Sequence, residues 1–117
     1  MKYPVLTNYI DGKNTPGGNG SLDVFSPLNG ELLSRVPMSG ASAVNAAVKA
    51  GRAAFAEWSD QPIKERVQVF YRYRNLLERD ADELAALVTE ENGKTRDEAL
   101  AEVLKSMELT EFACALP

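Results

Sequence analysis

Histidine is absent from the 117-residue sequence, and cysteine occurs once, as Cys114. The commonest general base of enzymes and the commonest transition-metal ligand are therefore missing, which argues against a zinc site. One cysteine cannot form an internal disulfide, and this fits a reducing compartment. Cys114 stands in an apolar helical context without a neighbouring base, so we interpret it as a buried, inert thiol.

Long apolar runs and basic tracts are missing as well. No stretch approaches the roughly 20 apolar residues of a membrane span, and residues 1–11 do not resemble a signal peptide. The net charge of -4 and the pI of about 4.8 argue against a nucleic-acid partner and against an anionic membrane surface. We therefore expect a cytoplasmic protein with neither nucleic acid nor membrane as a partner.

Turn-forming residues gather in the first 38 residues, which hold four of the six prolines and five of the eight glycines. We predict short strands at 5–10, 22–25 and 32–36. Asp11-Gly12 is a hairpin signal, and the turn at 27–30 should pair the second strand with the third. The glycine-rich segment 15–20 opens no helix, so we interpret it as a flexible loop tip and not as a dinucleotide fingerprint.

From residue 41 onward, apolar residues recur at helical steps of three and four. The first helix should end near 59–62, and Pro62 suits the first position of the next helix. The apolar stripe of the first helix consists of Val44, Val48, Gly51, Phe55 and Trp58.

Capping signals divide the remaining helical sequence. Asp80 to Glu83 has capping-box spacing and either begins a further helix or marks only a bend. Asn92-Gly93 is a helix stop, and Thr95 to Glu98 is a second capping box that opens the last helix. Gly93-Lys94-Thr95 is similar to the end of a phosphate-binding loop, but the glycine required five positions earlier is Val88, so we interpret it as a turn and an N-cap.

The residues alone contain no self-contained active site. The acidic residues near 80–83 and 90–91 are typical of a solvated helix face. Short strands need further strands to form a stable sheet, so we expect the chain to be part of a larger domain.

Several motifs follow one another in a specific order: Tyr9-Ile10-Asp11-Gly12-Lys13, the turn from Phe25 to Glu31, the helix from Val44 to Phe55 with Trp58 after it, Arg66, the segment from Glu90 to Thr95, and Glu98-Ala99 with Glu102-Val103. Together they resemble the N-terminal part of the NAD(P)-dependent aldehyde dehydrogenases, from about Tyr9 to Pro117. The ending from Glu111 to Pro117 is most similar to the CoA-acylating methylmalonate-semialdehyde dehydrogenases.

The resemblance implies an α/β parent enzyme with a Rossmann-type cofactor domain. Residues 1–117 would be the N-terminal part of that domain, with strands and turns over 1–38 and three or four helices over 41–117. The parent would oxidise an aldehyde, such as a semialdehyde, to an acid or acyl-CoA with NAD or NADP through a cysteine thioester. It would act as a homo-oligomer, a dimer or tetramer.

The catalytic and cofactor-binding residues of such enzymes lie beyond this segment. The resemblance therefore implies no catalytic and no cofactor-binding residue here, and an inactive 117-residue segment with no bound cofactor. It does imply a monovalent-cation site formed by carbonyls near Val24 and Phe25 and by the Glu91 carboxylate. The last helix would form one wall of the substrate tunnel, with Lys105 where the CoA-acylating subgroup has an arginine that helps to hold a substrate carboxylate. Lysine keeps the charge but loses the bidentate fork.

A second hypothesis is a stand-alone helical module without catalytic activity, which would dimerise or cap a partner through an exposed apolar face. The mass of the native gene product and its NAD(P)-dependent aldehyde oxidation distinguish the two hypotheses. An independent small enzyme is disfavoured, because the sequence contains no nucleophile–base pair.

Overall fold

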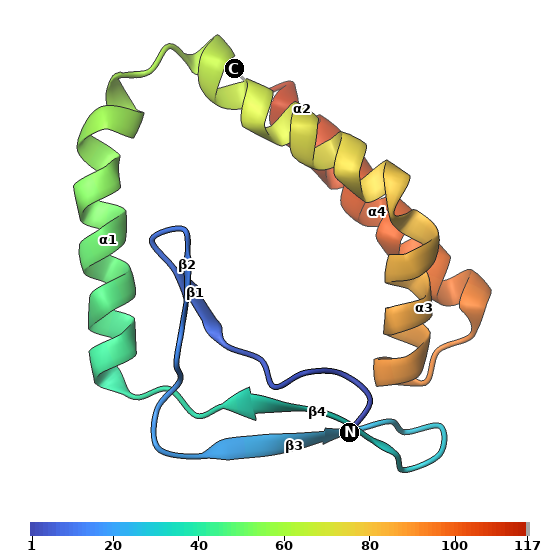
Figure 1. Cartoon of the computed structure of the whole chain (residues 1–117). Coiled ribbons are helices and arrows are strands. Elements are labelled where there is room, and N and C mark those ends of the chain that lie inside the picture. The colour runs from blue at the N-terminus through green and yellow to red at the C-terminus, as the bar shows by residue number, and fades with distance from the viewer. Residues whose placement is uncertain (117) are drawn as a thin grey trace. The chain divides into compact units, whose positions relative to one another are not determined.

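The computed structural model describes residues 1–116, which form two compact units with their boundary between Asp60 and Gln61. Among the described residues, the first unit holds four short strands and one helix, and the second holds three helices (Figure 1). The predicted order of short strands followed by helices is confirmed, and residues 1–116 contain four helices. Pro117, the last position of the predicted ending motif, lies outside the described residues.

The first two strands form the predicted hairpin at Asp11-Gly12. Strand β1 (Asn8–Ile10) pairs antiparallel with β2 (Lys13–Thr15), so that Ile10 lies opposite Lys13. Asp11 and Gly12 have φ angles of 54° and 72°, as the favoured two-residue hairpin turn requires. The strand β2 was not predicted, because Lys13-Asn14-Thr15 lacks apolar alternation and its pairing is set by the turn.

The N-terminal segment runs along another strand instead of extending β1. The backbone N–H groups of Lys2, Tyr3 and Leu6 donate to carbonyls of Leu32, Leu33 and Arg35 at 3.2, 2.8 and 2.9 Å. The predicted strand over 5–10 is therefore wrong for residues 5–7, and only 8–10 belong to β1. Sequence periodicity does not reveal this partner, which lies about thirty positions further along the chain.

Strands β3 (Ser21–Phe25) and β4 (Leu32–Pro37) form the second predicted pair, which is antiparallel. The register changes between Val24 and Phe25, because Val24 lies opposite Ser34 but Phe25 lies opposite Leu32. One extra residue, Leu33, is thus inserted in β4, which is the signature of a β-bulge.

The loop after β2 packs closely against the end of β4, which differs from the free loop tip expected from its composition. A Cβ atom built on Gly17 would lie 1.9 Å from Cβ of Pro37. The N–H of Met38 donates to the carbonyl of Gly20 at 2.9 Å. Glycine is needed at position 17 because the backbone approaches a rigid proline ring.

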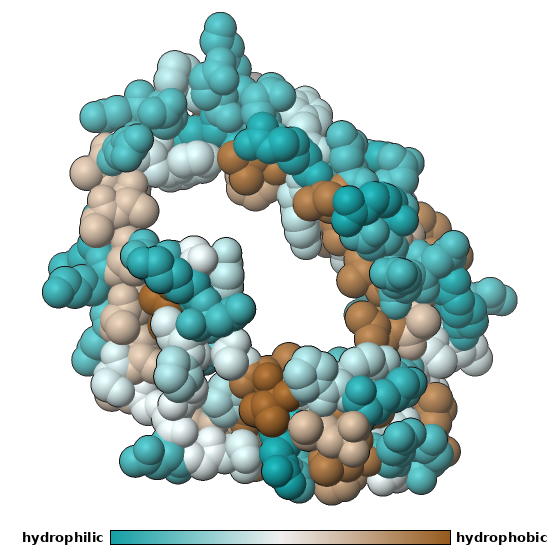
Figure 2. Space-filling view, viewed as in Figure 1, coloured by the Kyte–Doolittle hydropathy of each residue, from teal (hydrophilic) through white to brown (hydrophobic). Residues whose placement is uncertain are grey.

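Helix α1 (Ala41–Asp60) has the predicted extent but no buried residue. In the described structure its main contacts are with β1. The large residues of the predicted apolar stripe are exposed, and Figure 2 shows moderately apolar surface along α1 as well. The helical periodicity was therefore correct, but within the first unit nothing buries the stripe.

The second unit consists of α2 (Ile63–Arg79), α3 (Ala81–Asn92) and α4 (Arg96–Cys114), and α4 packs against both other helices. Its core cluster is formed by Ala85, Ala99 and Val103, and both alanines are fully buried. Pro62 lies one position before α2, as its N-cap, rather than at the predicted first helical position.

The two predicted capping boxes differ in the structure. Helix α3 does begin after Asp80, but the Asp80 side chain makes no cap hydrogen bond. Its two carboxylate oxygens instead accept from Nε and Nη2 of Arg79, each at 2.7 Å. A helix thus begins where the first capping box was predicted, but the box itself is wrong. A bidentate contact with Arg79 occupies the carboxylate that would form it.

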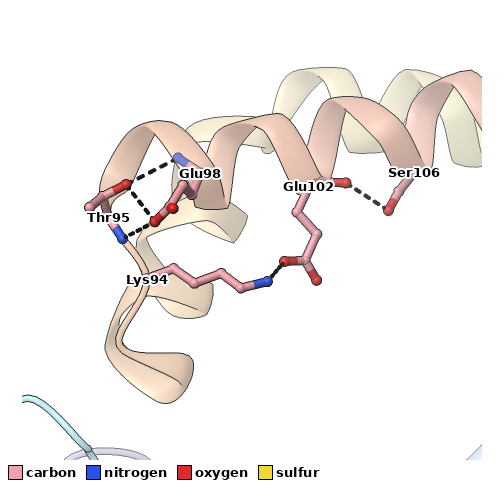
Figure 3. Close-up of polar contacts among 5 residues, drawn as sticks. All are labelled: Lys94, Thr95, Glu98, Glu102 and Ser106. Carbon is pink, nitrogen blue, oxygen red and sulfur yellow. Dashed lines mark hydrogen bonds and ion pairs between the residues drawn. The ribbon is translucent and has the colours of Figure 1, made fainter.

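The second capping box is confirmed at the start of α4 (Figure 3). Oγ1 of Thr95 accepts from the N–H of Glu98 at 3.4 Å, and the Glu98 carboxylate accepts from the N–H of Thr95 at 3.0 Å. Gly93 ends α3 in the left-handed region with φ of 81°, as predicted for a helix stop. The turn between α3 and α4 is thus defined at both ends by local sequence.

Gly17→Ala should destabilise the first unit by about 1–3 kcal/mol, because the added methyl group overlaps the Pro37 ring. Gly40→Ala is the matched control, since a Cβ at Gly40 meets nothing within 4 Å. Urea unfolding of the two variants measures the difference. Equal midpoints for Gly17→Ala and Gly40→Ala would show that the loop does not pack as described.

Thr95→Ala should cost the second unit about 1 kcal/mol, the usual value of an N-cap side chain. The Thr95 hydroxyl and then its N–H lower the pKa of Glu98. The contribution of Glu98 to folding stability is therefore complete above its unfolded-state pKa, and it is lost as the pH falls through its folded-state pKa. The difference in the free energy of unfolding between Thr95→Ala and wild type should shrink in acid, whereas Thr95→Ser should match wild type. A gap independent of pH in urea titrations would contradict the pairing.

Candidate functional site

The exposed side of α4 carries the residue predicted for the substrate tunnel. The buried residues of α4 form one stripe: Ala99, Val103, Met107, Thr110 and Cys114. Lys105 lies on the opposite side, together with Leu109 and Phe112 at the spacings that place residues on one helix face. Leu109 and Phe112 are 60% and 66% exposed. This face therefore combines a lysine ammonium group with large apolar side chains.

Lys105 forms a surface ion pair, and within residues 1–116 this is the one polar contact of its ammonium group. Its Nζ lies 2.5 Å from Oε2 of Glu108, and both side chains are about two-thirds exposed. Such exposed pairs stabilise a protein by at most about 1 kcal/mol. The ammonium group is therefore able to exchange Glu108 for another anion at little cost.

Lys94 forms an ion pair with Glu102 across the turn that joins α3 to α4 (Figure 3). The lysine that suggested a phosphate-binding loop thus has a carboxylate partner two turns into the following helix. Its position agrees with the interpretation of this segment as a turn and an N-cap.

The residues predicted for a monovalent cation are distributed over both units. Val24 and Phe25 lie at the bulge of the first unit, where one residue of the ladder is left unpaired. Glu91 lies exposed in the last turn of α3 in the second unit, at a helix end where the dipole favours cations. The bulge can offer carbonyl oxygens and the helix end can offer a carboxylate oxygen to a cation. The monovalent-cation site itself stays a prediction.

Cys114 is buried, as predicted, with 7% of its surface exposed. It occupies the last turn of α4 and continues the buried stripe of that helix. One turn earlier, the hydroxyl of Thr110 donates to the carbonyl of Ser106 at 2.8 Å. A nucleophilic thiol must be accessible to its substrate, so this position favours a structural role.

A link between α2 and α4 was missed by sequence reasoning. Nε of Arg74 donates to Oε1 of Glu111 at 2.7 Å, and Nη1 of Arg74 forms an ion pair with Glu78. Hydrogen bonds to Glu111 and then to Glu78 raise the pKa of Arg74. The Glu78 partner is readable from its four-residue spacing, but Glu111 lies 37 positions away and no sequence signal connects it.

Four ionisable side chains among residues 1–116 have clearly shifted pKa values, and none of these four is poised as a general acid or base. The shifts of Arg74, Arg79, Asp80 and Glu98 all favour the ordinary charged form. A general acid or base needs a pKa moved toward neutrality. In the same residues no group of three or more His, Cys, Asp or Glu could hold a metal ion, and no helix is long and apolar enough to cross a membrane.

Known proteins are similar to this chain in both sequence and backbone. The profile of the aldehyde dehydrogenase family matches residues 15–117. Malonate-semialdehyde dehydrogenase 1 of Geobacillus kaustophilus is 41% identical over 114 residues, which is 97% of this chain and 23% of the relative.

Two solved structures extend the comparison to the backbone. Methylmalonate-semialdehyde dehydrogenase of Oceanimonas doudoroffii superposes with a TM-score of 0.92 at 32% identity, over 100% of this chain and 24% of its own. An NAD-dependent benzaldehyde dehydrogenase of Corynebacterium glutamicum gives a TM-score of 0.88 at 26% identity, over 93% of this chain and 24% of its own. The chain thus spans about a quarter of the length of these relatives, and it belongs to the aldehyde dehydrogenase family.

Proposed function

We propose that the chain is part of an aldehyde dehydrogenase that oxidises malonate or methylmalonate semialdehyde with NAD(P)⁺. One observation carries the substrate class: the 41% identity to a malonate-semialdehyde dehydrogenase extends over 97% of this chain. The product is the acid or the acyl-CoA, and the ending of the last helix favours CoA as the acceptor. Residues 1–117 then form the N-terminal part of the cofactor-binding domain.

The exposed face of α4 supports a substrate that carries a carboxylate. Lys105 supplies a positive charge that a surface ion pair holds only weakly. Leu109 and Phe112 on the same face supply apolar walls. In this proposal the ammonium group exchanges Glu108 for the substrate carboxylate, while the apolar side chains exclude water from the aldehyde end.

The dinucleotide and the reacting groups belong to the rest of the enzyme. A dinucleotide site needs a glycine turn between a strand and the start of a helix. The glycine-rich segment here joins β2 to β3 and packs against Pro37, so these residues do not fit the cofactor. This chain would contribute one wall of the tunnel and the scaffold of the domain.

Three further features belong to the same proposal. The carbonyls of Val24 and Phe25 and the carboxylate of Glu91 hold a monovalent cation, a hard ion that suits oxygen ligands. The whole enzyme is a homo-oligomer, which rests on the family resemblance. A cytoplasmic location is supported by the single, buried cysteine.

The test is an intact-mass measurement on the native gene product together with an aldehyde oxidation assay with and without CoA. We expect a mass several-fold above 12.8 kDa and reduction of NAD(P)⁺ with malonate semialdehyde. A CoA requirement would identify the acyl acceptor. A 12.8 kDa product without activity would contradict the proposal and favour the stand-alone interaction module.

Lys105→Gln in that product should raise KM for malonate semialdehyde by roughly 10-fold, the equivalent of one weakened charge-assisted contact. KM for propionaldehyde, which has no carboxylate, should stay unchanged. Lys105→Arg should restore the low KM, because arginine keeps the charge. Equal increases in KM for both aldehydes would show that Lys105 does not recognise the substrate carboxylate.

A further inference from the structure

Lys105 has two glutamates at the same spacing on α4. Glu102 lies three positions before Lys105, and Glu108 lies three positions after it. Residues three positions apart are neighbours on a helix surface, so the sequence alone makes both carboxylates possible partners of the ammonium group. Both glutamate side chains are more than half exposed, so burial does not distinguish them.

A second lysine decides which glutamate pairs with Lys105. Nζ of Lys94, in the turn before α4, forms an ion pair with Oε2 of Glu102 (Figure 3). Glu102 therefore has its own cation, and Lys105 pairs with Glu108, whose Oε2 lies 2.5 Å from Nζ. Glu108 is also four positions before Phe112, so it lies on the same face of the helix as the apolar side chains beside Lys105.

The ion pair of Lys105 and Glu108 has no net charge. A carboxylate that approaches the ammonium group must either displace Glu108 or share the ammonium group with it, and in the shared arrangement the two carboxylates repel each other. Each route costs binding free energy that an unpaired ammonium group would not cost. Because the ion pair is exposed, this cost corresponds to at most about 5-fold in affinity.

We propose that Glu108 is an internal competitor for the ammonium group of Lys105, and that it weakens the binding of aldehydes that carry a carboxylate relative to neutral aldehydes. The inference rests on the proposed function, in which Lys105 binds the substrate carboxylate. Glu108 acts through Lys105 and sets how strongly the enzyme prefers a semialdehyde. Glu102 has no such role, because Lys94 holds its carboxylate.

The test compares Glu108→Gln with Glu102→Gln in the native gene product. Each variant removes one negative charge three positions from Lys105, and both side chains are exposed, so the helix content in circular dichroism should match wild type. One readout is the ratio of KM for malonate semialdehyde to KM for propionaldehyde. The other is the dissociation constant of 3-hydroxypropionate by calorimetry, which needs no turnover because this ligand carries the carboxylate but no aldehyde.

Glu108→Gln should lower both the KM ratio and the dissociation constant by about 3-fold, within the range of an exposed ion pair. Glu102→Gln should change them by less than about 1.5-fold, because its carboxylate pairs with Lys94. In the Lys105→Gln background, Glu108→Gln should also change them by less than about 1.5-fold, because no ammonium group is released.

Wild-type values in Glu108→Gln, or an equal decrease in both glutamine variants, would overturn the proposal. A full effect of Glu108→Gln in the absence of Lys105 would overturn it too, and so would binding of 3-hydroxypropionate to neither wild type nor Glu108→Gln. Tighter binding of 3-hydroxypropionate to Glu108→Gln, in a protein that does not oxidise malonate semialdehyde, would retain the internal competitor and count against the proposed function alone.

Discussion

The close contact of α4 with α2 and α3 is the constraint on which the second unit depends. Ala85 of α3 and Ala99 of α4 are both fully buried, and Val103 lies one turn beyond Ala99. Small side chains at this contact allow the two helix backbones to approach, so larger residues there would force them apart. The capping box at Thr95 and the Gly93 turn set the entry of α4, which places the alanine stripe against its partners.

The same packing decides where the chemistry of α4 lies. One side of α4 is buried in the core, so Lys105, Leu109 and Phe112 on the opposite side point away from the core. Ion pairs such as Arg74 with Glu111 join the helices at the rim of the contact. The second unit therefore supplies a rigid helix with a mixed cationic and apolar face, while α1 in the first unit supplies an apolar stripe.

Local sequence signals predicted much of the fold. The hairpin at Asp11-Gly12, the stop at Gly93 and the capping box at Thr95 depend on residues within a few positions of one another, and each is confirmed. The N-terminal segment was misassigned because its hydrogen-bond partners on β4 lie far along the chain. Asp80 was misassigned because Arg79 competes for its carboxylate.

The candidate site was less accessible to prediction for a related reason. The burial of Cys114 follows from its apolar context and is confirmed. The Arg74–Glu111 link needs tertiary packing that periodicity does not encode. The monovalent-cation site rests on the family resemblance alone and stays a prediction.

The central claim is that α4 buries one face against α2 and α3, whereas no residue of α1 is buried within its own unit. Native-state hydrogen exchange on the dilute 117-residue chain tests this claim most directly. Backbone amides of α4 between Ala99 and Met107 should exchange at least roughly 100-fold more slowly than those of α1 between Val48 and Phe55, because protection follows local burial. Equal protection of the two helices, or greater protection of α1, would contradict the account.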